Sequence, residues 1–264
     1  MKTKLLALLL GVVFILSFAA CSTPDATDWE YIQKNGQMYI GITYFEPMNY
    51  LENNELTGFE TEFAKAVCEI LGVKPIFQEI QWSAKETELN AKNIDCIWNG
   101  MTIDEDRARN MSISKPYMQN KQILVVKAEN QAAALASVDG LSIVAEAGSA
   151  GETVCKEEAF FANANFTAVD TQAKALMEVA AGTADGCVID YVMSIGMIGE
   201  GTDFSGLVVV EERGFGEEEY GIAMRKADKE FTAKVNAAID TLIANGKLMQ
   251  IAEKYKLGEL LITK

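Results

Sequence analysis

Arg107 has the clearest chemical potential in the sequence, because it lies in an acidic stretch just after a turn that offers hydrogen-bond donors. The segment CIWNGMTIDEDRARN (residues 96–110) begins as an apolar strand, breaks at Asn99-Gly100 and presents one hydroxyl at Thr102. A guanidinium is a planar fork of donors that matches a carboxylate with two parallel hydrogen bonds. With the Thr102 hydroxyl and unpaired N–H groups near Gly100, Arg107 predicts an anion site.

The segment AEAGSAGE (residues 145–152) offers a second set of donors. An apolar strand ends at Ala145, a small flexible turn follows at residues 148–151, and we expect a helix to begin at Glu152. The backbone N–H groups at the start of that helix would point at whatever occupies the turn. Asp190 follows another apolar strand and offers a carboxylate suited to an ammonium group. Two donor sets and one carboxylate match the zwitterion of an α-amino acid.

Phe45, beside a proline, and Trp82 could form apolar walls for such a ligand. Each candidate also has a purely structural interpretation. Arg107 could pair with an acidic neighbour on a solvated face, a contact worth little energy. The turn at 148–151 could be an ordinary loop, Asp190 could cap the helix after it, and the two aromatic residues could belong to the core. The prediction of a binding site rests on the joint placement of these residues at strand ends.

The composition excludes several classes of function. The chain has 264 residues, 49% of them hydrophobic, which is enough for one large domain or two lobes of roughly 100 residues each. It carries 38 acidic and 23 basic side chains, and this negative field repels nucleic acid and anionic lipid headgroups. It contains no histidine, so Ser-His and Cys-His nucleophile pairs and imidazole metal sites are ruled out. Much familiar hydrolase chemistry is therefore missing, and we expect no catalytic residue, metal or cofactor.

The N-terminus is typical of an export signal. Two lysines precede an unbroken apolar run at residues 5–16, and a short segment rich in small residues leads into Cys21. This pattern resembles a bacterial lipoprotein signal, although Phe18 stands where leucine is usual. The resemblance implies a signal peptide over residues 1–20, acylation of Cys21, and a polar tether over residues 21–28 that links the protein to the outer face of the cell membrane. The alternative is ordinary secretion with cleavage nearby.

Four further cysteines occur in the body of the chain: Cys68, Cys96, Cys155 and Cys187. An exported protein could pair them in disulfides. However, Cys96 and Cys187 lie in apolar runs typical of strands, the other two lie in helical segments, and none has CxxC spacing. We interpret them as small buried hydrophobic residues.

Short apolar runs alternate with amphipathic helical stretches along the chain, which predicts an α/β architecture whose sheets are covered on both faces. The predicted strands are residues 38–43, 76–80, 96–98, 123–127, 141–145, 187–189 and 207–210. The clearest helix is GFETEFAKAVCEILG (residues 58–72). Its apolar face holds Phe59, Phe63, Ala66, Val67 and Ile70, and its other faces hold Glu60, Glu62 and Glu69.

The segments LNAKNIDCIWN and VAAGTADGCVID share a short internal similarity. Each runs from a helix end through a turn to an aspartate, Asp95 or Asp185, and then into a buried strand. These equivalents, 90 residues apart, fit two similar α/β lobes, although so short a repeat could also arise by chance. Ligands of open α/β sheets bind beyond the carboxyl ends of strands. The turn after the first strand and Asp190 after the second would then face each other across a cleft.

At these residues the sequence resembles the polar amino-acid-binding proteins of bacterial ABC importers, the family 3 extracellular solute-binding proteins. The resemblance covers about residues 39–262 and includes the family signature in GFETEF (residues 58–63). The segments NIDCIWNGMTIDEDRARNMSISKPYM, AGSAGE, CVID and EEYGIAMRK follow in the order typical of the family. The combination is specific, because chance would not place four such motifs in this order.

The resemblance implies a type II periplasmic-binding-protein fold, an α/β fold of two lobes joined by two crossover hinge strands. Lobe 1 would comprise residues 29–121 and 217–264. Lobe 2 would comprise residues 122–216. The crossovers would lie near residues 122–126 and 219–222.

The resemblance also implies roles for the candidates in lobe 1. The aromatic residues Phe45 and Trp82 would sandwich the ligand. Asn99, Gly100 and Thr102 would bind it through backbone groups and the hydroxyl. Arg107 would clamp its α-carboxylate.

In lobe 2, the backbone N–H groups and hydroxyl of Gly148, Ser149 and Ala150 would add to the carboxylate site. Ala150 would contribute only its N–H, because it stands where relatives often carry serine or threonine. Asp190 would hold the α-ammonium group.

The resulting prediction is a membrane-tethered monomer that captures an amino acid between its lobes and delivers it to the permease subunits of an ABC transporter. The alternative is an enzyme of the same fold, since some relatives are dehydratases that act on amino-acid-like carboxylic acids. A sensor module of a receptor kinase would need a second apolar span, which we do not expect here. Thr43, Glu46 and Glu86 are candidates for contacting the side chain of the ligand.

Overall fold

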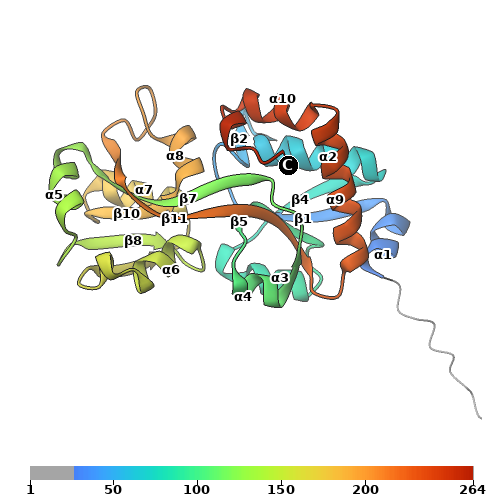
Figure 1. Ribbon diagram of the computed structural model, residues 1–264, viewed down its shortest axis with the longest axis horizontal. Helices are drawn as coiled ribbons and strands as arrows, with labels where there is room; N and C mark the ends of the chain where they lie inside the picture. Colours follow the sequence, from blue (N-terminus) through green and yellow to red (C-terminus); the bar gives the residue numbers. More distant parts are fainter. Residues whose placement is uncertain (1–26, 264) are drawn as a thin grey trace, which may run out of the picture.

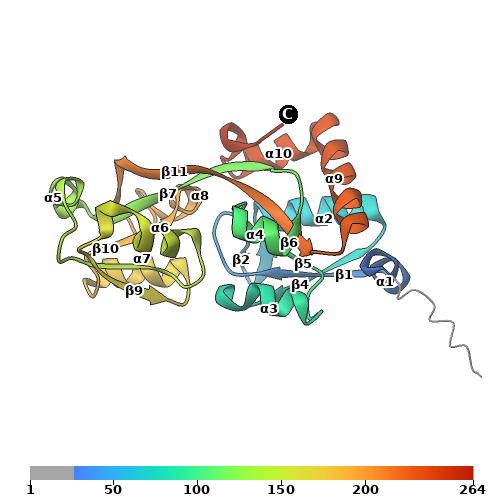
Figure 2. The same cartoon turned by 60° about the horizontal axis from the view of Figure 1, so that its bottom comes forward.

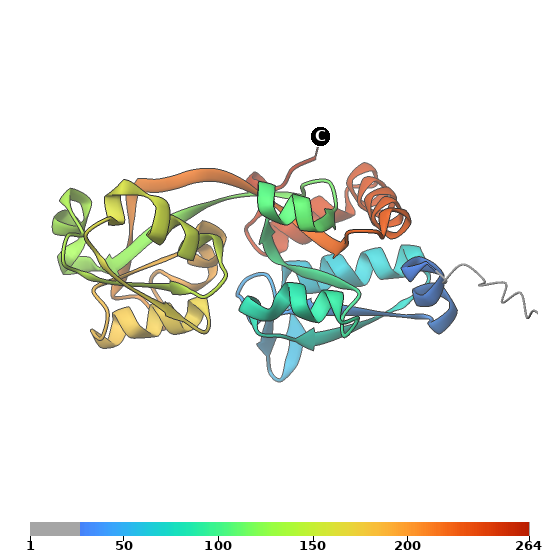
Figure 3. The same cartoon turned by 90° about the horizontal axis from the view of Figure 1, so that it is seen from below.

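The chain forms two α/β lobes that lie side by side in this computed structural model, which describes residues 27–263 apart from the side chains of residues 211–213 (Figure 1). Two long strands, β7 (Met118–Lys127) and β11 (Leu207–Arg225), pass between the lobes as an antiparallel pair. Figures 2 and 3 show this pair along one side of the molecule, so it can act as a hinge. The predicted two-lobed α/β fold is confirmed, and we propose that the lobe boundaries fall inside these strands, at 121/122 and 216/217.

The strands form one continuous sheet with the crossing pair at its centre. The other strands are β1 (Gln37–Ile42), β4 (Lys74–Glu79), β5 (Cys96–Thr102), β6 (Met111–Ile113), β8 (Ser142–Glu146), β9 (Asn165–Val169) and β10 (Gly186–Asp190). Their order is β4-β1-β5-β11-β7-β10-β8-β9, and β6 pairs with β11. A separate hairpin, β2 (Tyr50–Glu52) and β3 (Glu55–Thr57), was not predicted.

This order is symmetrical about the crossing pair, and the symmetry explains the internal similarity of the sequence. In lobe 1, β1 pairs in parallel with β4 and β5, and in lobe 2, β8 pairs in parallel with β9 and β10. The carboxylate of Asp95 accepts the N–H of Tyr39 at 2.8 Å, and its own N–H donates to the Tyr39 carbonyl. Asp185 makes the same two bonds with Ser142. The two aspartates therefore perform the same task, joining neighbouring strands in each lobe.

Helices cover the sheet on both faces in each lobe. They are α1 (Asp28–Asn35), α2 (Phe59–Leu71), α3 (Lys85–Asn90), α4 (Glu105–Asn110), α5 (Gln131–Ala136), α6 (Ala150–Glu157), α7 (Gln172–Ala181), α8 (Tyr191–Met197), α9 (Lys229–Ala244) and α10 (Lys247–Lys254). In lobe 1, α2, α9 and α10 pack together on one face, and α3 lies on the other (Figures 1 and 2). In lobe 2, Leu124 and Val126 of β7 join the core under α5 and α6, whereas Ile123 and Val125 join the core under α7 and α8.

Helix α2 shows one error in the predicted amphipathic pattern. Phe59 and Phe63 are fully buried as expected, and the helix ends before Gly72, whose φ of 71° is left-handed. However, Glu60 is also fully buried, and Ile70 is 43% exposed. Periodicity alone placed Glu60 among the polar residues, but its side chain is drawn inward by partners on other elements.

Strand β5 is longer than predicted. The strand continues from Cys96 through Asn99-Gly100 to Thr102, and its pairing with β11 shifts register between Gly221 and Ala223. The predicted break is therefore an irregularity within a paired strand, and the chain leaves the sheet only after Thr102.

All four cysteines in the body of the chain are buried free thiols, as interpreted from the sequence. Within residues 27–263, no helix is both long enough and apolar enough to span a membrane. Cys21 and the predicted signal peptide lie outside the described residues.

Candidate functional site

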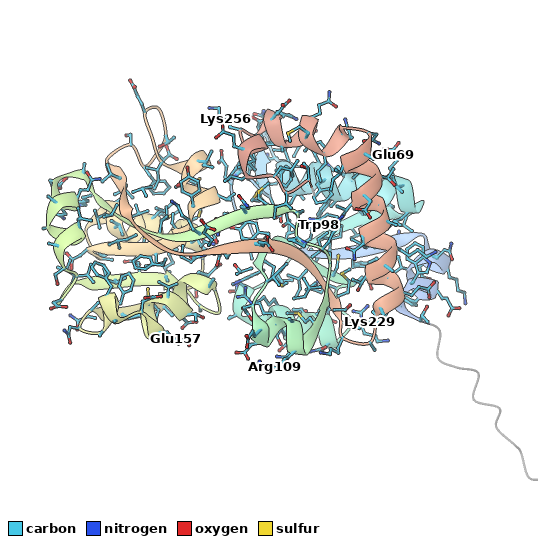
Figure 4. The ribbon with its side chains drawn as sticks, in the orientation of Figure 1. Glu69, Trp98, Arg109, Glu157, Lys229 and Lys256 are labelled. Atoms are coloured by element: carbon cyan, nitrogen blue, oxygen red, sulfur yellow. The ribbon has the colours of Figure 1, made fainter. Side chains whose placement is uncertain are left out.

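Arg107 lies at the end of lobe 1 that faces lobe 2, where α4 follows β5. The Asp104 carboxylate accepts the Arg107 N–H at 2.7 Å and lies 3.2 Å from Nε, while Nη1 donates to the Thr102 carbonyl at 2.8 Å. Arg107 is only 8% exposed, whereas the side chain of Arg109, two residues further on, is 64% exposed and points outward (Figure 4). Arg107 is therefore not a solvated surface residue, and its guanidinium is held in place by its own turn.

The backbone of the turn in β5 is less available than predicted. The N–H of Gly100 is not free, because it donates to a Glu60 carboxylate oxygen at 2.8 Å. The side chain of Asn99 is also occupied by Thr43. Its Oδ1 accepts the Thr43 N–H at 2.8 Å, and its Nδ2 donates to the Thr43 hydroxyl at 2.7 Å. Gly100 has a φ of +54°, and a Cβ there would lie 2.5 Å from the Phe45 ring. The glycine thus lets Phe45 pack directly against the strand.

Glu60 holds this region together. Besides the Gly100 N–H, its carboxylate accepts hydrogen bonds from the Tyr117 hydroxyl and, at 2.9 Å, from Nδ2 of Asn49. Burial raises the pKa of Glu60 to about 7, and the three hydrogen bonds act in the opposite direction. Glu60 is a positioning residue, because it joins α2 to the strand that carries the candidate site.

The turn in lobe 2 opens directly into α6, which begins at Ala150, two residues before the predicted start. The Ser149 hydroxyl caps the helix by accepting the N–H of Glu152 at 3.1 Å, and the N–H of Gly148 donates to the Glu152 carboxylate at 2.6 Å. The N–H groups of Ala150 and Gly151 are at the helix start and have no acceptor within the helix. Of the predicted donors, the Ala150 N–H is therefore better placed for a ligand than the Gly148 N–H.

Two glycines bring lobe 2 against lobe 1. The carbonyl of Gly148 accepts hydrogen bonds from Lys85 Nζ at 2.9 Å and from Arg107 Nη2 at 3.3 Å. On α8, a Cβ added to Gly196 would lie 3.1 Å from Cγ of Glu46. The lobes therefore contact each other at two separate places, so the structure is the closed form of the protein.

Asp190 ends β10 and faces Arg107 across the lobe boundary. Its Oδ1 accepts from Asn120 at 2.6 Å and Gln122 at 2.7 Å, its Oδ2 accepts from Gln172, and its N–H donates to Gln172 at 2.9 Å. Asp190 does not cap α8 with its side chain, so that alternative is wrong. These three donors are neutral amides, which leave acceptor capacity on the carboxylate and do not compensate its negative charge, as a site for an ammonium group requires.

Three further ionisable side chains surround these residues. Burial is the main cause that raises the pKa of Glu146 to about 8 and that of Glu218 to about 7, and the negative charge of Asp190 is the second cause. Glu218 accepts from two of the amides that donate to Asp190, those of Asn120 and Gln122, so the two carboxylates are close neighbours. Burial, assisted by Arg107, lowers the pKa of Lys85 to about 8. The site thus combines two cations with three carboxyl groups.

A cavity of about 10 Å³ lies where these elements meet. Its lining residues are Trp82, Asn99, Gly100, Thr102 and Arg107 from lobe 1, and Glu146, Ser149, Ala150, Gln172 and Asp190 from lobe 2. Phe45 lies just behind Gly100, and Gly148 lies between the lobes. A cavity of this volume holds about one water molecule, so an amino acid can enter only when the lobes separate.

Sequence reasoning missed Glu60, Lys85, Glu146, Gln172 and Glu218. Glu146 lies two residues before the predicted turn and Glu218 lies within the EEYGIAMRK segment, so position alone could have identified both. Gln172 and Lys85 open helices in segments that carry no recognisable motif. Their role in the site follows only from the tertiary structure.

Comparison with known proteins gives the following similarities. The family described as bacterial extracellular solute-binding proteins, family 3, matches residues 38–259. The L-arginine-binding protein of Pseudomonas aeruginosa is 32% identical over 227 residues, which cover 82% of this chain and 86% of that protein.

Solved structures of amino-acid-binding proteins are also similar to this chain. A substrate-binding protein of an ABC uptake transporter from Streptococcus pneumoniae, with bound histidine, has a TM-score of 0.80 and 30% identity, and the match covers 91% of this chain and 100% of that one. The ancestral amino-acid-binding protein AncCDT-1, a precursor of cyclohexadienyl dehydratase, has a TM-score of 0.77 and 28% identity, and the match covers 87% of this chain and 99% of that one.

Proposed function

Because this chain belongs to the bacterial extracellular solute-binding proteins of family 3, we propose that the cavity between its lobes binds an α-amino acid. The chain is the extracytoplasmic substrate-binding component of an ABC importer, which captures its ligand outside the cytoplasm and delivers it to the membrane permease. The observation that carries the proposed site is the opposition of Arg107 and Asp190, which line one buried cavity from different lobes.

In this proposal Arg107 takes the α-carboxylate of the ligand, together with the Ala150 N–H at the start of α6. Asp190 takes the α-ammonium group. Trp82, which lines the cavity and is 5% exposed, forms an apolar wall. Because each lobe supplies one end of the recognition, a bound amino acid favours the closed form.

Calorimetry with the twenty amino acids tests the proposal. We expect one-to-one binding of at least one L-amino acid, and a loss of about 30-fold to several thousandfold in Arg107→Ala, because removing one partner of a buried charge pair costs roughly 2 to 5 kcal/mol. Arg109→Ala is the matched control and should bind as wild type does, since its side chain is exposed. Binding by Arg107→Ala as tight as in wild type would refute the assignment.

A dehydratase-like enzyme is the second candidate function. One observation favours it: burial raises the pKa of Glu146 to about 8, so this cavity-lining side chain is a protonated acid at neutral pH and could serve as a general acid. Incubation with the bound ligand, followed by NMR, separates the two functions, because a binding protein leaves its ligand chemically unchanged.

We also propose that the protein is exported as a lipoprotein and held by lipid on Cys21, as a monomer that contacts the permease. In Cys21→Ala we expect a folded protein that leaves the membrane fraction, because acyl chains on Cys21 would be its anchor. Fractionation and immunoblotting measure this, with binding of the same ligand as the folding control. A variant that stays with the membranes would contradict the lipid anchor.

A further inference from the structure

We propose that Glu146 is a specificity residue that selects ligands with a cationic side chain. This inference rests on the proposed amino-acid site and names the class of ligand that the site accepts. It begins from the charges that remain once both ends of an amino acid are bound.

The α-carboxylate and α-ammonium groups use Arg107 and Asp190, which leaves Glu146 as the third ionisable residue that lines the cavity. Glu146 ends β8 and is 4% exposed. Among the described side chains, no lysine or arginine forms an ion pair with it. A buried carboxylate without a cationic partner is costly, so a ligand cation beside Glu146 would be strongly favoured.

The nearby lysine does not cancel this charge. Lys85 Nζ donates to two backbone carbonyls, those of Gly148 at 2.9 Å and Trp82 at 3.4 Å, and lies 4.6 Å from the centre of the Trp82 ring. Its charge lowers the pKa of Glu146, but by less than burial and Asp190 raise it. With Glu218, which lies beside Asp190, the region holds two cationic and three acidic side chains. When all three carboxyl groups are ionised, one additional positive charge on the ligand balances them.

The protonation of Glu146 supports the same conclusion. Burial and Asp190 raise its pKa to about 8, and the opposing effects of Lys85 and Gln172 are too small to hold the carboxylate ionised at neutral pH. A ligand ammonium or guanidinium group within hydrogen-bonding distance would lower the pKa of Glu146 and so favour its ionised form. Trp82 lines the same cavity from the opposite lobe and adds apolar surface for the alkyl chain of such a ligand.

The lining also disfavours the other ligand classes. An acidic side chain would add a further negative charge next to Glu146, Asp190 and Glu218. A neutral side chain would leave Glu146 either charged without a partner or protonated. Charge balance thus separates cationic amino acids from neutral ones of the same shape.

Two pairs of matched ligands test the proposal by calorimetry: L-arginine against L-citrulline, in which a urea group replaces the guanidinium, and L-lysine against L-norleucine. In wild type we expect the cationic member of at least one pair to bind about 30-fold or more tightly than its neutral partner. In Glu146→Gln this preference should fall below about 5-fold, mainly through weaker binding of the cation. Residual binding of the neutral ligand shows that the variant is folded.

Glu157→Gln is the matched control, because it removes the same charge from the same lobe at an exposed position (Figure 4). It should keep the full preference for the cation. If neutral and cationic members bind wild type equally, or if Glu146→Gln keeps the full preference, the inference is wrong while the amino-acid site stands. If no amino acid binds to wild type, the proposed site fails as well.

Discussion

Buried carboxyl groups dominate this protein at the scale of single residues. Glu60, Glu146 and Glu218 each have a pKa raised to about 7 or 8, in every case because burial disfavours the charged form. Glu60 serves the structure, since its three donors come from separate segments of lobe 1. Glu146 and Glu218 lie beside Asp190, where the proposed ligand would supply positive charge. Residues of one type thus have two roles, determined by their partners.

These shifts predict how the stability of the ligand-free protein depends on pH. Each group keeps its proton in the folded state up to about pH 7 or 8 but loses it near pH 4.5 when unfolded, so the folded state binds more protons in between. The free energy of unfolding should therefore fall as pH rises from 5 to 8, by about 1 to 3 kcal/mol per group. Urea denaturation at both pH values measures this.

Glu146→Gln should reduce the pH dependence, and the exposed Glu157→Gln should leave it unchanged. The carboxyls with lowered pKa, such as those of Glu62 and Glu152, do not interfere, because they lose their protons below this range in both states. A stability that rises from pH 5 to pH 8 would contradict the assignment of buried, protonated carboxyl groups.

At the scale of elements, the turn between β8 and α6 connects recognition to closure. Gly148 has a φ of +74°, and its carbonyl accepts from Lys85 and Arg107 of the other lobe. A Cβ on Gly148 would lie 3.1 Å from Cα of Ser83, a backbone atom that cannot move aside easily. The glycine is therefore required twice, once for its backbone conformation and once for the close approach of the lobes.

Gly148→Ala should weaken ligand binding by about tenfold, because the added methyl group opposes closure at a cost of the order of 1 kcal/mol. Gly140→Ala is the matched control, since Gly140 also has a φ of +74° but a Cβ there would meet no atom within 4 Å. Both variants should lose similar stability from the left-handed backbone, about 1 to 2 kcal/mol. Equal affinity in the two variants would show that Gly148 does not limit closure. Calorimetry and urea denaturation separate the two effects.

For the whole molecule, the crossing pair β7 and β11 allows two states. The lobes meet at Gly148 and Gly196, and the enclosed cavity of about 10 Å³ is too small for an amino acid. Ligand entry therefore requires an open form, and the two-strand connection along one side permits it (Figure 3). The ligand favours closure because it contacts both lobes.

Small-angle scattering should show a smaller radius of gyration when wild type is saturated with its amino acid. The change should be absent in Arg107→Ala at the same ligand concentration, because this variant lacks the proposed carboxylate partner in lobe 1. Glu157→Gln should close as wild type does. A scattering curve of wild type that does not change at saturation would contradict closure on the ligand.

The sequence alone determined the α/β class, the two-lobed plan and the segments that carry the site. Apolar runs and helical periodicity are local properties, and the motifs around Arg107, Gly148 and Asp190 lie at strand ends that local patterns can locate. Eight of the ten predicted binding residues consequently line one cavity in the structure. Their functional roles remain predictions that the variants above test.

Packing between remote segments determines which groups form hydrogen bonds within the protein and which are left for a ligand. Glu60 looked like a surface acid by its helical position, and the Gly100 N–H looked free, until folding brought them within 2.8 Å of each other. Glu146 acquired its significance in the same way, because its burial and the proximity of Asp190 depend on how β8 and β10 are placed in lobe 2. Charge balance in a buried site depends on distances between remote segments, and those distances are determined by packing rather than by local sequence.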